Sequence, residues 1–146
     1  MSEGHYFTSE GYFTSQMPDN AIELPQKGAG IMAKSKLREL SMDFSVKVLK
    51  LSETVKGHHS LVNQLERSST SIGANIHEAN YAHSKADFVA KLQIALKECY
   101  ETEYWIELFV RAELMDRESA IPLYNQCGTI RRVLIASINT AKENQK

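Results

Sequence analysis

Apolar residues recur every three or four positions along most of the chain after residue 32. The first series predicts a helix over about 33–55 whose apolar face consists of Leu37, Leu40, Phe44, Val48, Leu51 and Val55. Three later series predict helices over about 61–81, over about 84–114, and from Asp116 or Ser119 onwards. No alternating strand pattern competes with them.

The expected helix ends carry suitable residues. Gly57 suits a left-handed turn after the first helix, and Ser60 is the expected N-cap of the second. Ser84, with Asp87 in the first turn, is expected to cap the third helix. Pro122 is expected in the first turn of the fourth helix, where proline is tolerated.

Four amphipathic helices with short connections favour an all-α, antiparallel up-down-up-down four-helix bundle over residues 32–146. The second helix carries several small residues that let a neighbouring helix approach closely: Ser68, Ser69, Ser71, Gly73 and Ala74.

Residues 1–31 differ in kind and predict an irregular, extended or disordered arm, interrupted by Pro18 and Pro25. Residues 3–9 are nearly repeated at 10–15, with aromatic and hydroxyl side chains alternating. This segment can pair as a strand or dock on a partner, and a leader or an expression-derived segment explains it equally well.

Charge and cysteine content narrow the class of protein. The chain has 17 basic and 18 acidic side chains, and residues 1–31 hold four of the acidic ones and a single lysine. The expected bundle is therefore nearly neutral, with little overall attraction to nucleic acid or an anionic membrane. Cys99 and Cys127 fall in apolar stripes, so we expect buried packing and a reducing, cytoplasmic setting, without a membrane segment.

Motifs for catalysis or metal binding are not found in the sequence. A di-iron bundle needs Glu-x-x-His pairs, and none occurs. The serine-rich stretch at 68–71 has no Gly-x-Ser-x-Gly elbow, and neither a P-loop nor an HExxH motif is present. We therefore expect no enzyme, no metal and no cofactor.

Two other features suggest contacts with partners. Glu101 and Trp105 lie one turn apart in the third helix, which favours either a solvated acidic face or an intersubunit surface. The basic clusters of the bundle are candidate nucleic-acid contacts, although no aromatic side chains are interleaved with them: Lys34, Lys36 and Arg38 at the start of the first helix, and Arg131 and Arg132 near the start of the fourth.

Segments 67–79, 84–92 and 101–108 resemble a bacterial four-helix-bundle family whose members include proteins encoded in intervening sequences of 23S ribosomal RNA genes. The motif blocks Ser-Ile-x-x-Asn-Ile-x-Glu and Glu-Thr-Glu-x-Trp carry the resemblance, which covers residues 34–142. The chain is similar, more distantly, to the accessory variability proteins of diversity-generating retroelements.

The resemblance implies a homopentameric ring, with nucleic acid or a reverse transcriptase as partner in the retroelement branch. The motif positions are expected at helix or subunit interfaces, where hydrogen bonds across to another helix or subunit would satisfy their polar groups: Ser71, Asn75, Glu78, Glu101, Glu103 and Trp105.

This chain departs from the family in two ways. The family usually has Gly after the second-helix Glu, where Ala79 stands here, which puts a helix end at that point in doubt. The nucleic-acid-binding relatives are strongly basic, so phosphate binding by this nearly neutral bundle is expected to be weak at physiological salt.

Overall fold

The structure is a computed structural model, and it describes residues 6–7, 13–14 and 30–144. The described chain contains six elements: β1 (Tyr6–Phe7), β2 (Phe13–Thr14), α1 (Gly30–Ser52), α2 (His59–Ala79), α3 (Lys85–Arg111) and α4 (Arg117–Glu143). All four elements from Gly30 onwards are helices, so the prediction of an all-α bundle is confirmed for this part of the chain.

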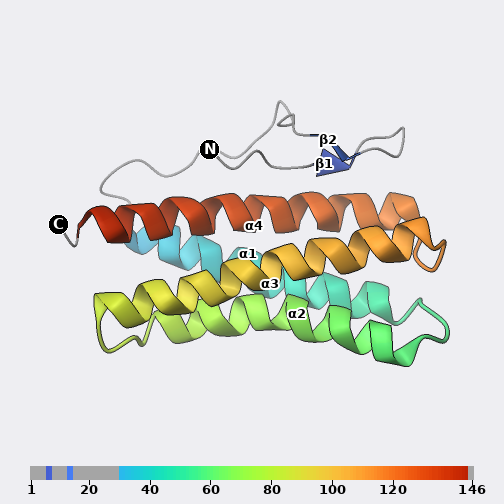
Figure 1. Ribbon diagram of the computed structural model, residues 1–146, viewed down its shortest axis with the longest axis horizontal. Helices are drawn as coiled ribbons and strands as arrows, with labels where there is room; N and C mark the ends of the chain where they lie inside the picture. The colour runs from blue at the N-terminus through green and yellow to red at the C-terminus, as the bar shows by residue number, and fades with distance from the viewer. Residues whose placement is uncertain (1–5, 8–12, 15–29, 145–146) are drawn as a thin grey trace.

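The helices form a bundle in which each one runs in the opposite direction to the one before it (Figure 1). Helix α1 packs against α2 and α4, while α3 packs against α2 and α4. Within the described chain, the diagonal pairs α1–α3 and α2–α4 make no close backbone contact. Each helix thus has two neighbours and one outer side.

One apolar core runs through the bundle. The predicted face of α1 is confirmed at Phe44 and Val48, which are buried, while Leu40 and Leu51 are half-buried at its edge. Full burial of a Leu or Phe side chain stabilises the fold by about 1.5–3 kcal/mol, so this core supplies the main driving force. All four helices contribute to it, with Phe44, Leu65, Phe109 and Leu134 among its fully buried members.

Two of the expected caps are present. The hydroxyl of Ser84 accepts a hydrogen bond of 3.1 Å from the Asp87 amide, as predicted. Of the two alternatives for α4, Asp116 is the N-cap, because its carboxylate accepts a hydrogen bond of 3.0 Å from the Ser119 amide.

Three predicted helix ends differ in the structure. Ser60 lies inside α2, because that helix begins at His59 and its N-cap is His58, at φ 52°. Pro122 lies inside α4 beyond the first turn, since the Asp116 cap starts the helix early. Helix α2 ends at Ala79 and Asn80 is its C-cap, so the helix stops before the predicted end near residue 81. The alanine at position 79 has therefore not prolonged it.

Small residues bring α2 close to its neighbours, as predicted. A methyl group added at Gly73 would lie 3.4 Å from the Ser41 hydroxyl of α1. On the other side of α2, the buried hydroxyls of Ser68 and Thr102 share a hydrogen bond of 2.9 Å with each other. Each of these contacts fixes α2 against one neighbouring helix.

In the N-terminal region, β1 and β2 pair antiparallel, with Tyr6 opposite Thr14 and Phe7 opposite Phe13. Strand β1 lies against α4 (Figure 1). Strand pairing, one of the alternatives left open for the arm, is therefore present at these residues. The other residues assigned to the arm up to Ala29 lie outside the described chain, and α1 already begins at Gly30, ahead of the expected boundary at residue 32.

The turn between α1 and α2 gives the first testable prediction. Gly57 has φ +75° with no heavy atom near its missing side chain, and His58 has φ 52°. We expect Gly57→Ala to lower the free energy of unfolding by about 1 kcal/mol, because a side chain strains a left-handed backbone. His58→Gly should raise it by about 0.5 kcal/mol by relieving the same strain. Urea denaturation followed by circular dichroism tests both variants. A change of the free energy of unfolding in the same direction in both would contradict this account.

Candidate subunit interface on the α2–α3 side

Polar and apolar side chains gather on the outer side where α2 packs against α3. We call this surface the α2–α3 seam and define it by Arg67, Asn75, Ile94, Glu98, Glu101 and Trp105. Residues 94, 98, 101 and 105 follow one another at helical steps of three and four, which places them on one face of α3. Arg67 reaches this face from α2.

Arg67 links two carboxylates of the seam. Its guanidinium donates a hydrogen bond to Glu101 Oε1 and lies 3.6 Å from Glu98 Oε1. The Trp105 indole N–H donates to the same Glu101 oxygen at 3.2 Å. Glu101 and Trp105 are thus brought together, one turn apart, and the charge of Glu101 is balanced by Arg67.

The environment of Glu101 keeps it ionised. Burial alone would raise the pKa of Glu101, but hydrogen bonds from Trp105 and Arg67 and the positive charge of Arg67 lower this pKa below its ordinary value. The hydrogen bond to Glu101 in turn raises the pKa of Arg67. The pair is therefore charged on both sides at neutral pH.

Glu98 is less well satisfied than Glu101. Its Oε2 atom is buried and accepts no hydrogen bond within the described chain. A buried acceptor without a donor costs about 1–3 kcal/mol, so such groups in native proteins call for a physical explanation. The seam therefore holds a carboxylate oxygen that an additional donor would stabilise.

The second-helix motif residues divide between local and cross-helix contacts. Asn75 Nδ2 donates to the Ser71 carbonyl at 2.9 Å and to the Ser71 hydroxyl at 3.1 Å, both within α2. Glu78 Oε2 accepts a hydrogen bond of 2.7 Å from Lys91 of α3. Glu78 thus makes the cross-helix bond that was expected, whereas the observed bonds of Asn75 stay in its own helix.

Glu103, the remaining motif carboxylate, points into the bundle. Arg131 Nε of α4 donates to Glu103 Oε1 at 2.9 Å. The side chain of Arg131 is 2% exposed and that of Glu103 is 11% exposed. Burial alone would lower the pKa of Arg131, but the charge and hydrogen bond of Glu103 raise it above the ordinary value. This ion pair joins α3 to α4 within one chain.

From the sequence, Glu103 was expected at an interface and Arg131 at a nucleic-acid contact, although both residues lie in the apolar stripe of their helix. Glu103 follows the buried Cys99 by four residues, and Arg131 follows the buried Cys127 by four. An acidic and a basic residue, each inside an apolar stripe on adjacent helices, indicate a buried pair. Both cysteines are buried and free, as expected for packing residues, and burial raises the pKa of the Cys127 thiol.

The two basic clusters have different exposure. Lys34, Lys36 and Arg38 are exposed near the start of α1, and the Lys34 ammonium lies 4.9 Å from the Phe88 ring centre. Arg131 and Arg132 are both buried, and they lie in the middle of α4 rather than near its start. Phosphate recognition needs accessible charge, so of these two clusters only the one on α1 remains a candidate for phosphate contact.

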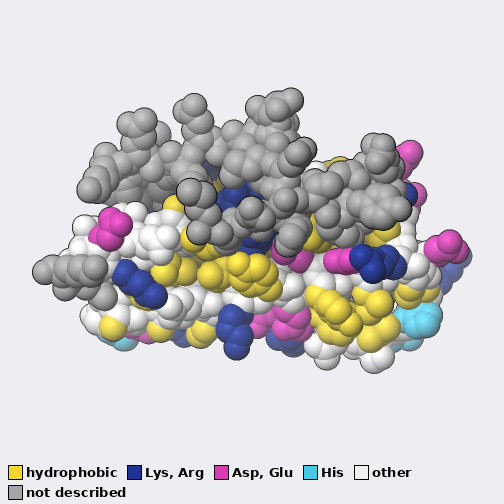
Figure 2. All heavy atoms as spheres, turned by 45° about the horizontal axis from the view of Figure 1, so that its top comes forward, with side chains coloured by type: hydrophobic (Ala, Val, Ile, Leu, Met, Phe, Trp, Pro, Cys, Tyr) yellow, Lys and Arg dark blue, Asp and Glu magenta, His cyan; other side chains and the backbone are white. Residues whose placement is uncertain are grey.

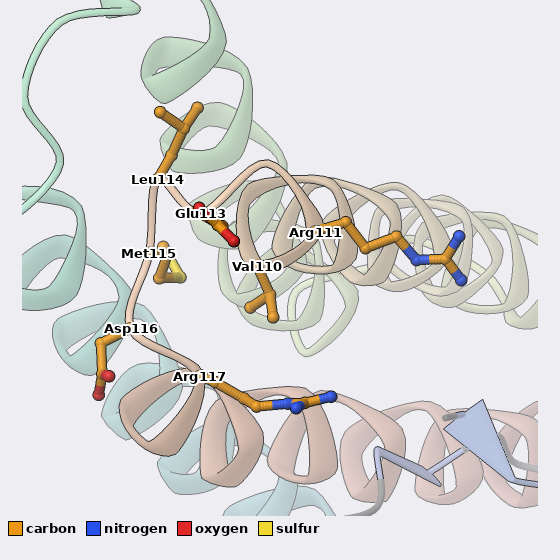
Figure 3. Close-up of a pocket in the computed structure, with 7 residues that line it drawn as sticks. All are labelled: Val110, Arg111, Glu113, Leu114, Met115, Asp116 and Arg117. Carbon is orange, nitrogen blue, oxygen red and sulfur yellow. The ribbon is translucent and has the colours of Figure 1, made fainter. Parts of the chain in front are cut away.

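A hollow of about 450 Å³ lies at the turn between α3 and α4. Figure 3 shows the side chains of Arg111 and Arg117 extending along their helices away from Leu114 and Asp116 of the turn. Arg111 forms a salt bridge with Glu107, one turn earlier in α3. The charge of Arg111 at the edge of this hollow is thus balanced from within α3.

Exposed large apolar side chains fall mainly on two helices. On α1 they are Met42, Val46 and Leu49, and on α3 they are Ile94, Tyr100 and Tyr104. Figure 2 shows hydrophobic side chains interspersed with charged ones over the visible side of the bundle. Tyr81, after the end of α2, stands apart from both groups.

No helix among the described residues is both long and apolar enough to span a bilayer. In the same part of the chain, no three His, Cys, Asp or Glu side chains are grouped as metal ligands would be.

The fold and the seam define the class of this protein: an antiparallel four-helix bundle in which polar side chains of the second and third helices connect α2, α3 and α4. The chain belongs to the 23S rRNA-intervening sequence protein family, whose sequence profile matches residues 33–136.

A solved structure supports this assignment. The chain is 40% identical to a protein of unknown function from the S23 ribosomal protein family of Bacteroides thetaiotaomicron, with a TM-score of 0.69. The match covers 74% of this chain and 99% of that one. No curated protein matches the sequence.

Trp105 is the single tryptophan of the chain, so its fluorescence reports on the seam. On acidification, we expect the Trp105 fluorescence to change with a midpoint below pH 4.5, the ordinary pKa of a glutamate, because the pKa of Glu101 is lowered. The stabilisation by this carboxylate is present above its unfolded-state pKa and is lost as the pH falls through the lower folded-state pKa. Arg67→Met should shift the midpoint upwards, and Glu101→Gln should abolish the transition; an unchanged midpoint in Arg67→Met would contradict the assigned cause.

Proposed function

We propose that the protein is a non-enzymatic interaction module whose first partner is itself, and that five copies form a ring of four-helix bundles. The observation that carries this proposal is the exposed apolar row of Met42, Val46 and Leu49 on α1, together with the exposed Ile94, Tyr100 and Tyr104 of α3. Rows of this kind on a small bundle suit protein contacts, whereas scattered single residues do not.

The state of the charged groups supports a structural role. Glu101 is paired with Arg67, Glu78 with Lys91, and Glu103 with Arg131. A carboxylate whose pKa is lowered by a fixed cation, as in Glu101, is a poor general acid at neutral pH. These residues connect helices instead of converging on a cavity.

A second candidate function is binding of RNA or DNA through the basic start of α1. The exposure of Lys34, Lys36 and Arg38 favours it. A ring would repeat this cluster in every copy, so weak contacts of each copy with phosphate would add up.

The ring is tested by light scattering coupled to size-exclusion chromatography at micromolar concentration. Five copies of 16.5 kDa give an expected mass of roughly 83 kDa, five times the single-chain value. A mass of one chain at all concentrations would contradict self-association, and a different multiple would contradict the number five alone.

Nucleic-acid binding is tested by fluorescence anisotropy with a structured RNA fragment across a salt series. If the α1 cluster contacts phosphates, Lys34→Glu with Lys36→Glu should weaken binding and reduce the salt slope by about two phosphate contacts. Lys56→Glu, at an exposed position in the turn at the other end of α1, is the matched control and should leave both unchanged. Binding that is absent at low salt would exclude this function.

A further inference from the structure

We infer that the exposed row on α1 of one copy docks head to tail on the α2–α3 seam of the next copy. We call this row the α1 ridge and define it by Met42, Val46 and Leu49. The inference rests on the proposed self-association and adds to it the two surfaces that meet.

The α1 ridge is apolar although it faces away from the core. Met42, Val46 and Leu49 are 57%, 43% and 40% exposed, and their spacing of four and three places them on one face of α1. Phe44 and Val48, on the opposite face, are buried in the bundle. The ridge therefore gains from burial that this chain alone does not supply.

The seam offers a complementary centre. Ile94 is 43% exposed and lies one turn before Glu98 on the face of α3 that Arg67 approaches. Trp105 is half-buried in the same seam, and partly exposed tryptophan is among the residues that contribute most to protein interfaces. An apolar ridge can thus cover Ile94 while polar groups surround the contact.

Charges on the two surfaces are also complementary. Arg38 and Lys50, which flank the ridge along α1, are exposed and form no salt bridge within the described chain. The seam carries Glu98, whose Oε2 atom accepts no hydrogen bond from the described residues. A cation on a second copy would interact favourably with the Glu98 carboxylate, whose side chain is still 16% exposed, and this favours another copy of this chain as the occupant.

The placement of the two surfaces allows a closed ring. The ridge lies on the outer side of α1, and the seam lies between α2 and α3, so the two sides are neither identical nor directly opposite. A contact between two different surfaces repeats from copy to copy, and it gives a ring where the turns between successive copies add up to a full circle.

The available area is sufficient for such a contact. Helix α1 has 23 residues, which corresponds to about 35 Å, and two adjacent helices are about 20 Å wide. One side of the bundle therefore presents about 700 Å², close to the roughly 800 Å² per partner of a standard protein interface. Side-by-side packing of two bundles would use most of that side.

The test uses two variants of the full chain with the same introduced charge, Val46→Glu on the ridge and Ile94→Glu in the seam. Both positions are exposed in the single copy, so neither change should disturb folding, which circular dichroism checks. In the contact, each glutamate would be buried against apolar groups. We expect each variant to self-associate at least about 100-fold more weakly than the wild type.

Mixing the two variants separates a head-to-tail contact from a symmetric one. The Ile94→Glu copy keeps an intact ridge and the Val46→Glu copy keeps an intact seam, so one good contact forms between them. The opposite contact would bring the two glutamates together and stays open. Light scattering of the equimolar mixture should therefore give twice the single-chain mass, whereas each variant alone gives the single-chain mass.

Tyr81→Glu is the matched control, because Tyr81 is an exposed aromatic residue outside both surfaces. It should retain the wild-type mass. If the wild type itself is a single chain, the proposed function fails. If the wild type assembles but either variant keeps its mass, or the mixture remains single chains, the docking of ridge on seam is overturned while self-association stands.

Discussion

The buried ion pair between Glu103 and Arg131 is the contact on which the arrangement of α3 and α4 depends. Removing one partner of such a pair typically costs about 3–5 kcal/mol, because the other charge is left without compensation. Gly128 of α4 lies beside the pair, and a methyl group there would meet Arg131 Nη2 at 3.7 Å, an ordinary van der Waals distance. The negative charge of Glu103 also contributes, after burial, to raising the pKa of the nearby Tyr124 hydroxyl.

A side-chain hydrogen bond joins the two helices of each of the four neighbouring pairs. Apolar side chains alone permit several offsets between two helices, and directional bonds select one of them. The observed bonds connect Ser45 with Ser69, Ser68 with Thr102, Glu103 with Arg131, and Gln126 with Asp43. The side chains left on the outer faces, including the α1 ridge, are then held in defined positions by a rigid bundle.

The motif blocks of the family consequently have two roles in this chain. Glu103 and Thr102 face inward and connect α3 to its neighbours, while Glu101 and Trp105 lie on the outer seam beside Arg67. Residues that are adjacent in sequence are separated by about 100° around a helix, so one short block serves both the core and the surface. The interior bonds position the seam on which the proposed docking depends.

The sequence by itself determined the four helices, their apolar faces, the Ser84 cap and the family, because these depend on spacing and on residue types close together in the chain. Pairings over long sequence separation were decided only by the tertiary structure. Glu103 and Arg131 were assigned separately to an interface and to nucleic-acid contact, and packing of α3 on α4 made them partners. The exposure of Val46 and Ile94 was likewise beyond the sequence, since helical period identifies an apolar side chain but not whether another helix covers it.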